Sequence, residues 1–279
     1  MTATTSRATA APAPTARPLP LLRRALADGW RGLIGWSLGL AAVVGMYLPL
    51  YSTIGGNPEF LAVIDSLPPE LVAALSYDQI TTGAGYTQGT VHGLIGFVLV
   101  TIAAVAWGAS MIAGDDERGT LELVLAHGVS RTQIVLERFA AIVVKLVALT
   151  VVLGAMVLAL NGPSALDLTL DGIVAGSVAL LGLGLLTAAV GTLAGAIVGR
   201  RSIAVGAAAG VAVLGYALNA LGNQNPDLGW MHALSPYFWA FGAEPLATGF
   251  SPLMGVLFAV AAGALAVAVL AFRRRDVAV

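Results

Sequence analysis

Residues 114–131 read GDDERGTLELVLAHGVSR and separate two long apolar runs of the chain. The flanking runs, 91–111 and 139–160, each match the roughly 20 helical residues that cross a bilayer. The stretch between them has an acidic start, two interior glycines and a short apolar pattern of helical period. A charged, helix-forming loop between two membrane spans is therefore the feature that organises the fold.

The whole chain has the composition of a membrane protein. Of its 279 residues 58% are hydrophobic and 10% charged, and the mean hydropathy is +0.87, whereas soluble domains carry about 25% charged residues. Six apolar runs are long enough to span a bilayer: 32–50, 91–111, 139–160, 173–198, 203–221 and 252–272. We predict an all-α membrane protein in which residues 20–279 form a single six-span transmembrane domain.

The basic residues are confined to one set of loops. Of the 14 Lys and Arg residues, all except Lys145 lie before span one, between spans two and three, between spans four and five, or after span six. The other loops contain acidic residues and no basic ones. Because loops rich in Lys and Arg stay on the cytoplasmic side, we predict that both termini are cytoplasmic. Together with the Ala-, Gly- and Val-rich composition, this predicts a multi-pass protein of a bacterial cytoplasmic membrane.

The N-terminal region divides into two parts. Residues 1–19 are rich in Ala, Thr and Pro and have no apolar core, so we expect a disordered cytoplasmic tail rather than a cleavable signal peptide. Residues 20–31 read PLLRRALADGWR, which suits a helix in the cytoplasmic interface with Trp30 at headgroup level. We favour this N-terminal interfacial helix over a plain extension of span one.

The loop before the last span, 222–251, contains two apolar and aromatic patches, each too short to cross a bilayer. Irregular backbone inside a membrane must be covered by protein or line a cavity, so a broken re-entrant hairpin is one interpretation. An aromatic belt at the outer interface is the other. The sequence leaves the two open.

The charged loop has the pattern of two helices joined at a corner. Gly119 interrupts the chain, and an apolar stripe then follows at helical spacing: Leu121, Val124 and Leu125. Gly128 fits a left-handed helix stop, and Ser130 with Gln133 has the spacing of a capping box that begins the next helix. We predict a short rigid helix across the cytoplasmic ends of spans two and three.

Such a helix can seat its apolar stripe and acidic flank in a groove of a soluble partner, whose motion would move both attached spans. The alternative is a helix that rests on the bilayer. Acidic residues outnumber the lone Arg118 within 114–126, and the cytoplasmic leaflet is anionic. The charge therefore favours a protein partner.

The loop also resembles a known pattern. The run Glu117 to Glu122, ERGTLE, is followed by Leu125 and by VSR at 129–131, and it resembles the E-x-G-T-L-E-x-L-L and P-V-S-R loop of ABC-2 type transporter permeases. The ending FRRRD and the LSP stretch at 234–236 are similar to those of the family, as is the six-span layout. Gly128 stands where the family commonly has proline.

The resemblance implies a permease subunit of an ATP-driven exporter that moves a drug, antibiotic or lipid-like substrate outward. It implies a second permease half, identical or paralogous, and two copies of a separate ABC ATPase that binds ATP and Mg. The residues that match the family's coupling loop are Glu117, Gly119, Thr120, Leu121, Glu122, Leu125, Val129, Ser130 and Arg131.

The chain itself lacks the residues of an enzyme. A P-loop needs the lysine of G-x-x-x-x-G-K-[ST] to reach the phosphates, and the single lysine lies in VVKL. With no cysteine and three scattered histidines, we expect no metal site. We predict no catalytic residue, no cofactor bound by this chain and no nucleic-acid partner; the lipid bilayer is the expected surroundings.

Three residues are candidates for a substrate pathway: Lys145, Asn219 and Trp107. Charges inside membranes are usually functional, but a lysine near the cytoplasmic end of a span can snorkel, and this is the interpretation that we favour for Lys145. His92, at the outer start of span two, is interpreted as an interface residue.

Two other functions remain open. A non-transporting subunit that anchors or regulates an ATPase would carry the same loop. An ion-coupled secondary transporter normally uses buried Asp, Glu or His relays, and the six predicted spans contain no Asp or Glu.

Overall fold

The computed structural model describes residues 19–55, 57, 62–63, 66–69, 71–72, 79–126 and 128–275. Within these residues the chain is helical and has no strand. Apart from its last residue, the tail predicted for residues 1–19 lies outside the described residues, and so does His127.

Among the described residues, six helical segments are long and apolar enough to cross a membrane. They are Pro20–Thr53, Gly83–Ser110, Arg131–Asn161, Leu170–Val198, Arg201–Gln224 and Pro252–Arg274. Each predicted span lies inside one of them, apart from Met111 at the end of the second. The prediction of an all-α membrane protein with six transmembrane helices is confirmed.

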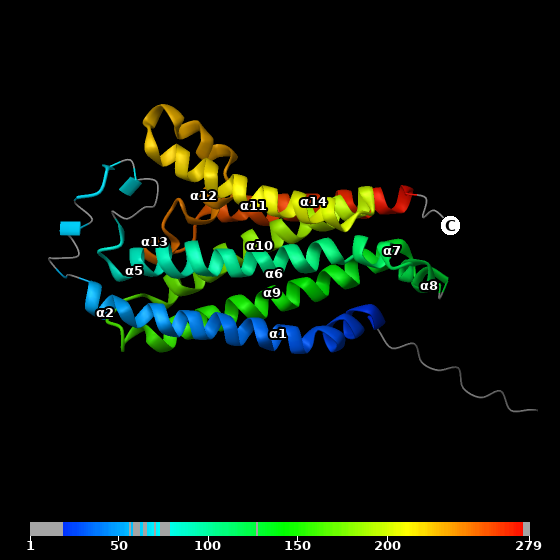
Figure 1. Ribbon diagram of the computed structural model, residues 1–279, viewed down its shortest axis with the longest axis horizontal. Coiled ribbons are helices and arrows are strands. Elements are labelled where there is room, and N and C mark those ends of the chain that lie inside the picture. Colours follow the sequence, from blue (N-terminus) through cyan, green and yellow to red (C-terminus); the bar gives the residue numbers. More distant parts are fainter. Residues whose placement is uncertain are drawn as a thin grey trace, which may run out of the picture.

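The six segments run along the long axis of the molecule (Figure 1). The first consists of α1 (Pro20–Tyr47), η1 (Leu48–Leu50) and α2 (Tyr51–Ile54). The second consists of α5 (Gly83–Tyr86), the π-helix η3 (Thr87–Gly96) and α6 (Phe97–Ser110). The others are α9 (Arg131–Asn161), α10 (Leu170–Val198), α11 (Arg201–Gln224) and α14 (Pro252–Arg274).

Helix α10 lies at the centre of the bundle and packs against α6, α9, α11 and α14. Small residues permit the close approach. A methyl group added at Gly108 of α6 would lie 2.5 Å from the carbonyl oxygen of Ala188 in α10, so the two backbones meet there. Faces of small residues pack helices in lipid in this way.

The start of α1 and the end of α14 lie at the same end of the bundle, together with the loop helices α7 and α8 (Figure 1). An even number of spans requires this arrangement. We call this end cytoplasmic, as the distribution of Lys and Arg predicts, and the opposite end outer.

Helix α1 is continuous from Pro20 to Tyr47. Residues 20–31, which we expected to form an interfacial helix, are therefore continuous with the helix of span one. These turns curve relative to the rest of α1 (Figure 1). Their position at the membrane surface stays a prediction.

The segment before span six folds back into the bundle. It forms the 3-10 helix η4 (Pro226–Leu234), α12 (Pro236–Phe241) and α13 (Pro245–Thr248). The Ser235 hydroxyl donates to the Gly215 carbonyl at 2.6 Å. Gly215 precedes the end of α11 by nine residues, or about 13 Å at 1.5 Å per residue. This backbone has the broken form that a re-entrant hairpin requires, and its depth in a bilayer stays a prediction.

His92 does not lie at an interface. Its side chain is 0% exposed, because α10 and α13 pack over this part of η3. The interpretation of His92 as an interface residue is wrong: its sequence position near the outer end of the span gave no sign of the returning segment that covers it.

Candidate functional site

The loop between spans two and three forms the predicted corner. It contains α7 (Ala113–Glu117) and α8 (Thr120–Ala126). Gly119 and Gly128 have φ angles of +66° and +78°, values at which residues with a Cβ are strained. The Ser130 hydroxyl accepts from the amide of Gln133 at 3.1 Å and so caps α9. The glycine break, the left-handed stop and the serine cap are confirmed.

The reciprocal half of the capping box is replaced by another contact. The Gln133 side chain donates to the Glu137 carboxylate at 2.6 Å, one turn further along α9. This bond orients a buried carboxylate that holds another helix, as described below.

The apolar stripe of α8 faces the protein's own core, which corrects the orientation expected for a partner contact. Leu121 is 1% exposed, and Val124 and Leu125 pack partly buried against the same core. The exposed residues of α8 include Glu122 and Leu123 instead; Leu123 is 64% exposed and lies at the edge of the cavity described below. An amphipathic pattern shows that one face is covered but not which molecule covers it.

Glu117 caps the start of span five. Its carboxylate accepts from the amide of Arg201 at 2.8 Å, the first residue of α11, whose own preceding residue Arg200 provides no side-chain cap. The first amides of a helix lack partners within the helix, and its positive end favours an anion. The acidic loop residue is thus bonded to a span far away in sequence.

Glu137 does the same for span one. It accepts from the amides of Leu21 at 2.8 Å and Leu22 at 3.1 Å, and it is only 5% exposed. The residue before α1, Leu19, offers no side-chain cap. Sequence reasoning missed Glu137. An acidic residue between the helix start at Arg131 and the apolar span was the available signal, but its partner could not be inferred.

The end of span six is held by Arg131. Its guanidinium donates to the Phe272 carbonyl at 3.1 Å and also to the Arg275 carbonyl, so a cation sits at the negative end of α14. Arg275 in turn pairs with Asp116 of α7 and donates to Gly195 of α10 at 3.4 Å.

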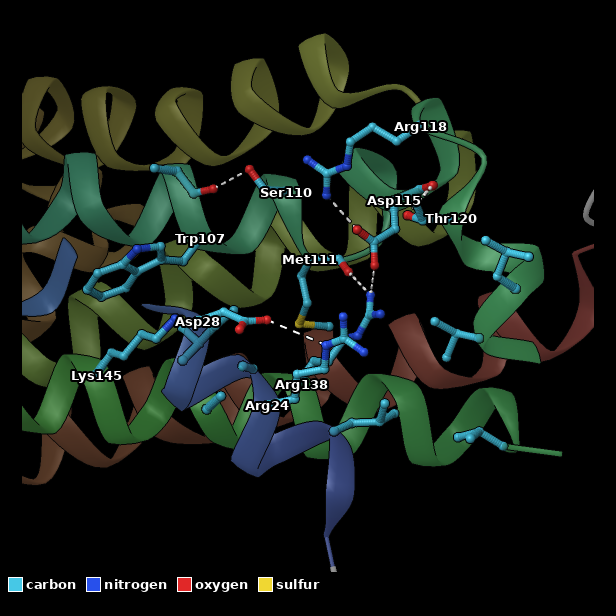
Figure 2. A pocket seen from close by; sticks show the side chains of 18 residues that line it. Arg24, Asp28, Trp107, Ser110, Met111, Asp115, Arg118, Thr120, Arg138 and Lys145 are labelled. Atoms are coloured by element: carbon cyan, nitrogen blue, oxygen red, sulfur yellow. Dashed lines mark hydrogen bonds and ion pairs between the residues drawn. The ribbon is translucent and has the colours of Figure 1, made fainter. Parts of the chain in front are cut away.

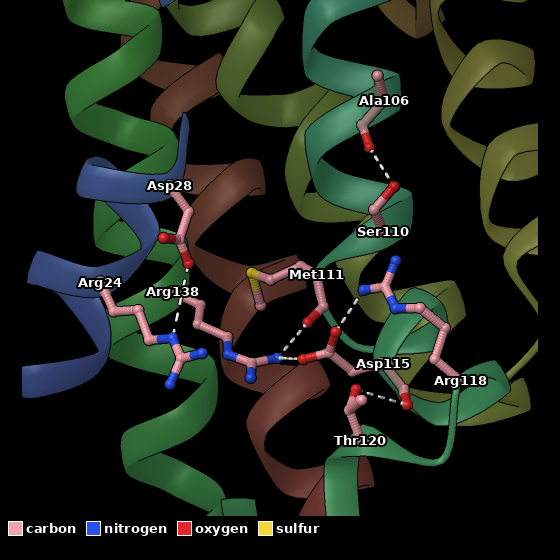
Figure 3. A network of polar contacts seen from close by, with 9 residues as sticks. All are labelled: Arg24, Asp28, Ala106, Ser110, Met111, Asp115, Arg118, Thr120 and Arg138. Carbon is pink, nitrogen blue, oxygen red and sulfur yellow. Dashed lines mark hydrogen bonds and ion pairs between the residues drawn. The ribbon is translucent and has the colours of Figure 1, made fainter. Parts of the chain in front are cut away.

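Asp115 joins the loop to span three (Figure 3). Its carboxylate pairs with Arg118 beside it and with Arg138 of α9. Arg138 also donates to the Met111 carbonyl at 2.8 Å. Polar bonds from the loop and the adjoining start of α9 therefore reach α1, α11 and the end of α14, and Arg275 extends the network to α10.

A cavity of about 820 Å³ lies beneath the loop, between α1, α6, α8 and α9 (Figure 2). Two of the three pathway candidates line it. The Lys145 ammonium lies 5.4 Å from the centre of the Trp107 ring. Asn219 is not among the lining residues; it is buried in α11, near the outer end. The structure thus brings Lys145 and Trp107 together and leaves Asn219 apart.

Among the described residues, no three His, Asp or Glu side chains are grouped so that they could hold a metal ion. The polar groups of the loop instead join helix ends to one another. The fold is that of a multi-pass membrane protein with six membrane-crossing segments. The hydrogen bonds and ion pairs of the loop between spans two and three lie at one end of the bundle.

The chain belongs to the ABC-2 family of transporter proteins, whose family description matches residues 19–277. It is therefore a permease subunit of an ABC transporter, a membrane component of a kind that typically lacks ATPase activity and associates with an ABC ATPase. A comparison with curated proteins found no match.

Proposed function

We propose that this permease is the transmembrane subunit of an exporter, and that a separate ABC ATPase drives it by pressing on α8. Two permease halves, identical or paralogous, would pair with two ATPase copies that hold ATP and Mg. The substrate would be a drug, an antibiotic or a lipid-like molecule, moved outward across a bacterial cytoplasmic membrane.

The observation that carries the proposal is the attachment of α8. Its inner face is packed on the core through Leu121, while Glu122 and Leu123 face outward. A helix fixed on one side and exposed on the other can receive a force from a partner. The outward pair, rather than the inward Leu121 and Leu125, is where we place that contact.

The bonds of the loop supply the route by which this movement reaches the spans. Glu117 of α7 is bonded to the start of α11, and Asp116 of α7 pairs with Arg275 at the end of α14. A displacement of α7 and α8 must carry these helix ends along or break their caps. ATP binding can shift the permease between two states only if the ATPase contacts α8 differently in each.

Among the alternatives, a proton-relay carrier is the less favoured. The described spans hold one buried carboxylate, Glu137, and it is already occupied by two backbone amides and one side-chain amide of this chain. Relays in secondary transporters need carboxylates that are available to the ion.

The test is co-purification and transport with the cognate ATPase. The double variant Glu122→Arg with Leu123→Asp should weaken ATPase binding at least about tenfold, because it reverses a charge and removes an apolar contact at the interface. ATP-driven uptake of substrate into inside-out vesicles should fall in parallel, with the thermal stability of the permease unchanged.

A matched control lies at the opposite end. Asp227→Arg with Leu234→Asp makes the same chemical changes on exposed residues of η4 and should leave ATPase binding intact. If both double variants bind the ATPase normally, α8 is not the contact. If the wild-type complex forms but moves no substrate, the non-transporting subunit is the better assignment.

A further inference from the structure

The cavity beneath α8 has an excess of positive charge. Its cationic lining residues are Arg24, Arg118, Arg138 and Lys145, and its carboxylates are Asp28 and Asp115. Asp115 pairs with two of the arginines, and Asp28 lies 3.6 Å from Arg24. Four cations against two anions leave the cavity positive by two charges.

Among the four cations of the cavity, Lys145 is the one without a direct ion-pair partner among the described residues. It is half-buried, and among the described residues no carboxylate or hydrogen-bond acceptor contacts its ammonium group. The Trp107 ring gives it a cation–π contact, which is weaker than an ion pair. The nearest carboxylate that acts on it is Asp28, which is already paired with Arg24. A partly desolvated ammonium without a direct hydrogen-bond partner favours the binding of a further anion.

The lysine is accommodated by α1. A methyl group added at Gly29 would lie 2.5 Å from the Lys145 nitrogen, so the side chain passes directly over a glycine. Figure 2 shows Lys145 and Trp107 at one side of the cavity, with Asp28, Arg24 and Arg138 beside them. The cations therefore come from three different helical elements and converge on one space.

Most of the remaining lining residues are apolar, with Ser110 and Thr120 as the exceptions. Leu21 and Ala25 of α1, Ala106 of α6 and Ile142 of α9 line the same space. Arg138 and Lys145 are seven residues apart on α9, or about 10 Å along its axis. A site with cations at two depths and apolar walls suits an ionised headgroup with the first carbons of its chains better than a hydrated inorganic ion.

We propose that this cavity binds the headgroup of an anionic phospholipid of the cytoplasmic leaflet. Basic pockets between spans on that side bind such headgroups, and the volume of about 820 Å³ is within the range of roughly 300–1,000 Å³ for small-molecule sites. Thr120, Leu123 and Val124 of α8 line the same cavity. A bound lipid therefore bridges α1 and α9 to α8 and stabilises one position of that helix.

The test uses the full chain in a neutral detergent, titrated with dioleoyl-phosphatidylglycerol. Native mass spectrometry and the midpoint of thermal unfolding report binding. We expect phosphatidylglycerol to bind more tightly than phosphatidylcholine with the same chains and to raise the midpoint. Lys145→Gln and Arg24→Gln should each weaken phosphatidylglycerol binding about fivefold, the share of one cation near a membrane surface.

Arg274→Gln is the matched control, because Arg274 is an exposed cation at the cytoplasmic end of α14 outside the cavity. It should bind phosphatidylglycerol like the wild type, and Lys145→Arg should retain most of the affinity. Equal losses in all the glutamine variants, or no loss in any, would overturn the proposal.

A second variant and a competition experiment complete the test. Arg24 is an exposed side chain, so its variant tests the site even if Lys145→Gln fails to fold. If inorganic phosphate or glycerol 3-phosphate competes as effectively as the lipid, the site takes a soluble anion and the lipid assignment is wrong. The test needs no ATPase, so its result is independent of the proposed export function.

Discussion

The surroundings of Glu137 and the π-helix η3 treat buried polar side chains in opposite ways. At the cytoplasmic end Glu137 is buried and accepts three hydrogen bonds. In η3, toward the outer end, four buried polar atoms have no partner among the described residues: Thr87 Oγ1, Gln88 Oε1 and both ring nitrogens of His92. Leaving a buried group unpaired costs about 1–3 kcal/mol.

The difference indicates where the molecule is rigid and where it can rearrange. Helix ends joined by polar bonds move together, which suits the region that receives a push. A π-helix has an irregular hydrogen-bond pattern and is often found at functional sites. We expect η3 to be the less stable part of span two, and three substitutions test the contrast.

The largest effect is expected at Glu137. Glu137→Ala leaves the amides of Leu21 and Leu22 without acceptors and should destabilise the protein by about 2–3 kcal/mol, the cost of losing buried bonds to a charged group. Thermal unfolding in detergent measures the loss. Glu137→Gln keeps an acceptor and should lose less; equal losses would mean that packing, not capping, is the role of this side chain.

A smaller loss is expected at Glu117. Glu117→Ala removes the exposed cap of α11 and should cost about 1 kcal/mol, the usual value for a helix cap. Because the chain has no cysteine, one cysteine introduced at Ser202 can report fraying of the first turn through its labelling rate. Labelling that stays unchanged in the alanine variant would count against the capping bond.

The smallest change should have the opposite sign. Thr87→Val replaces an unpaired buried hydroxyl by a methyl group of similar size and should leave stability unchanged or raise it by up to about 1 kcal/mol. Thr150→Val is the comparison, since that hydroxyl donates within α9. A clear loss of stability in Thr87→Val would show that the Thr87 hydroxyl has a partner, such as a buried water.

Local patterns predicted the local features well. The six spans follow from apolar runs, and the corner of the loop follows from Gly119, Gly128 and Ser130, because each of these residues acts on its own neighbours in the chain. The assignment of the loop to ATPase coupling came from its resemblance to the family and remains a proposal at the level of single residues.

Features that depend on distant contacts were not predictable. The stripe of α8 could have faced a partner or the core, and its spacing is the same in both cases. The burial of His92 requires the segment that returns before span six. The bond from Glu137 to Leu21 joins residues 116 positions apart, and no periodicity connects them.

That separation also has a consequence for how the protein is made. The amides at the start of α1 find their acceptor only after another 116 residues have been synthesised, which takes about 6–23 s at the usual rate of translation. The first span must therefore enter the membrane with its leading turn unfinished. The first turn of α1 gains its acceptor, Glu137, only when α9 has been inserted. The order in which the spans are inserted therefore affects how the bundle assembles.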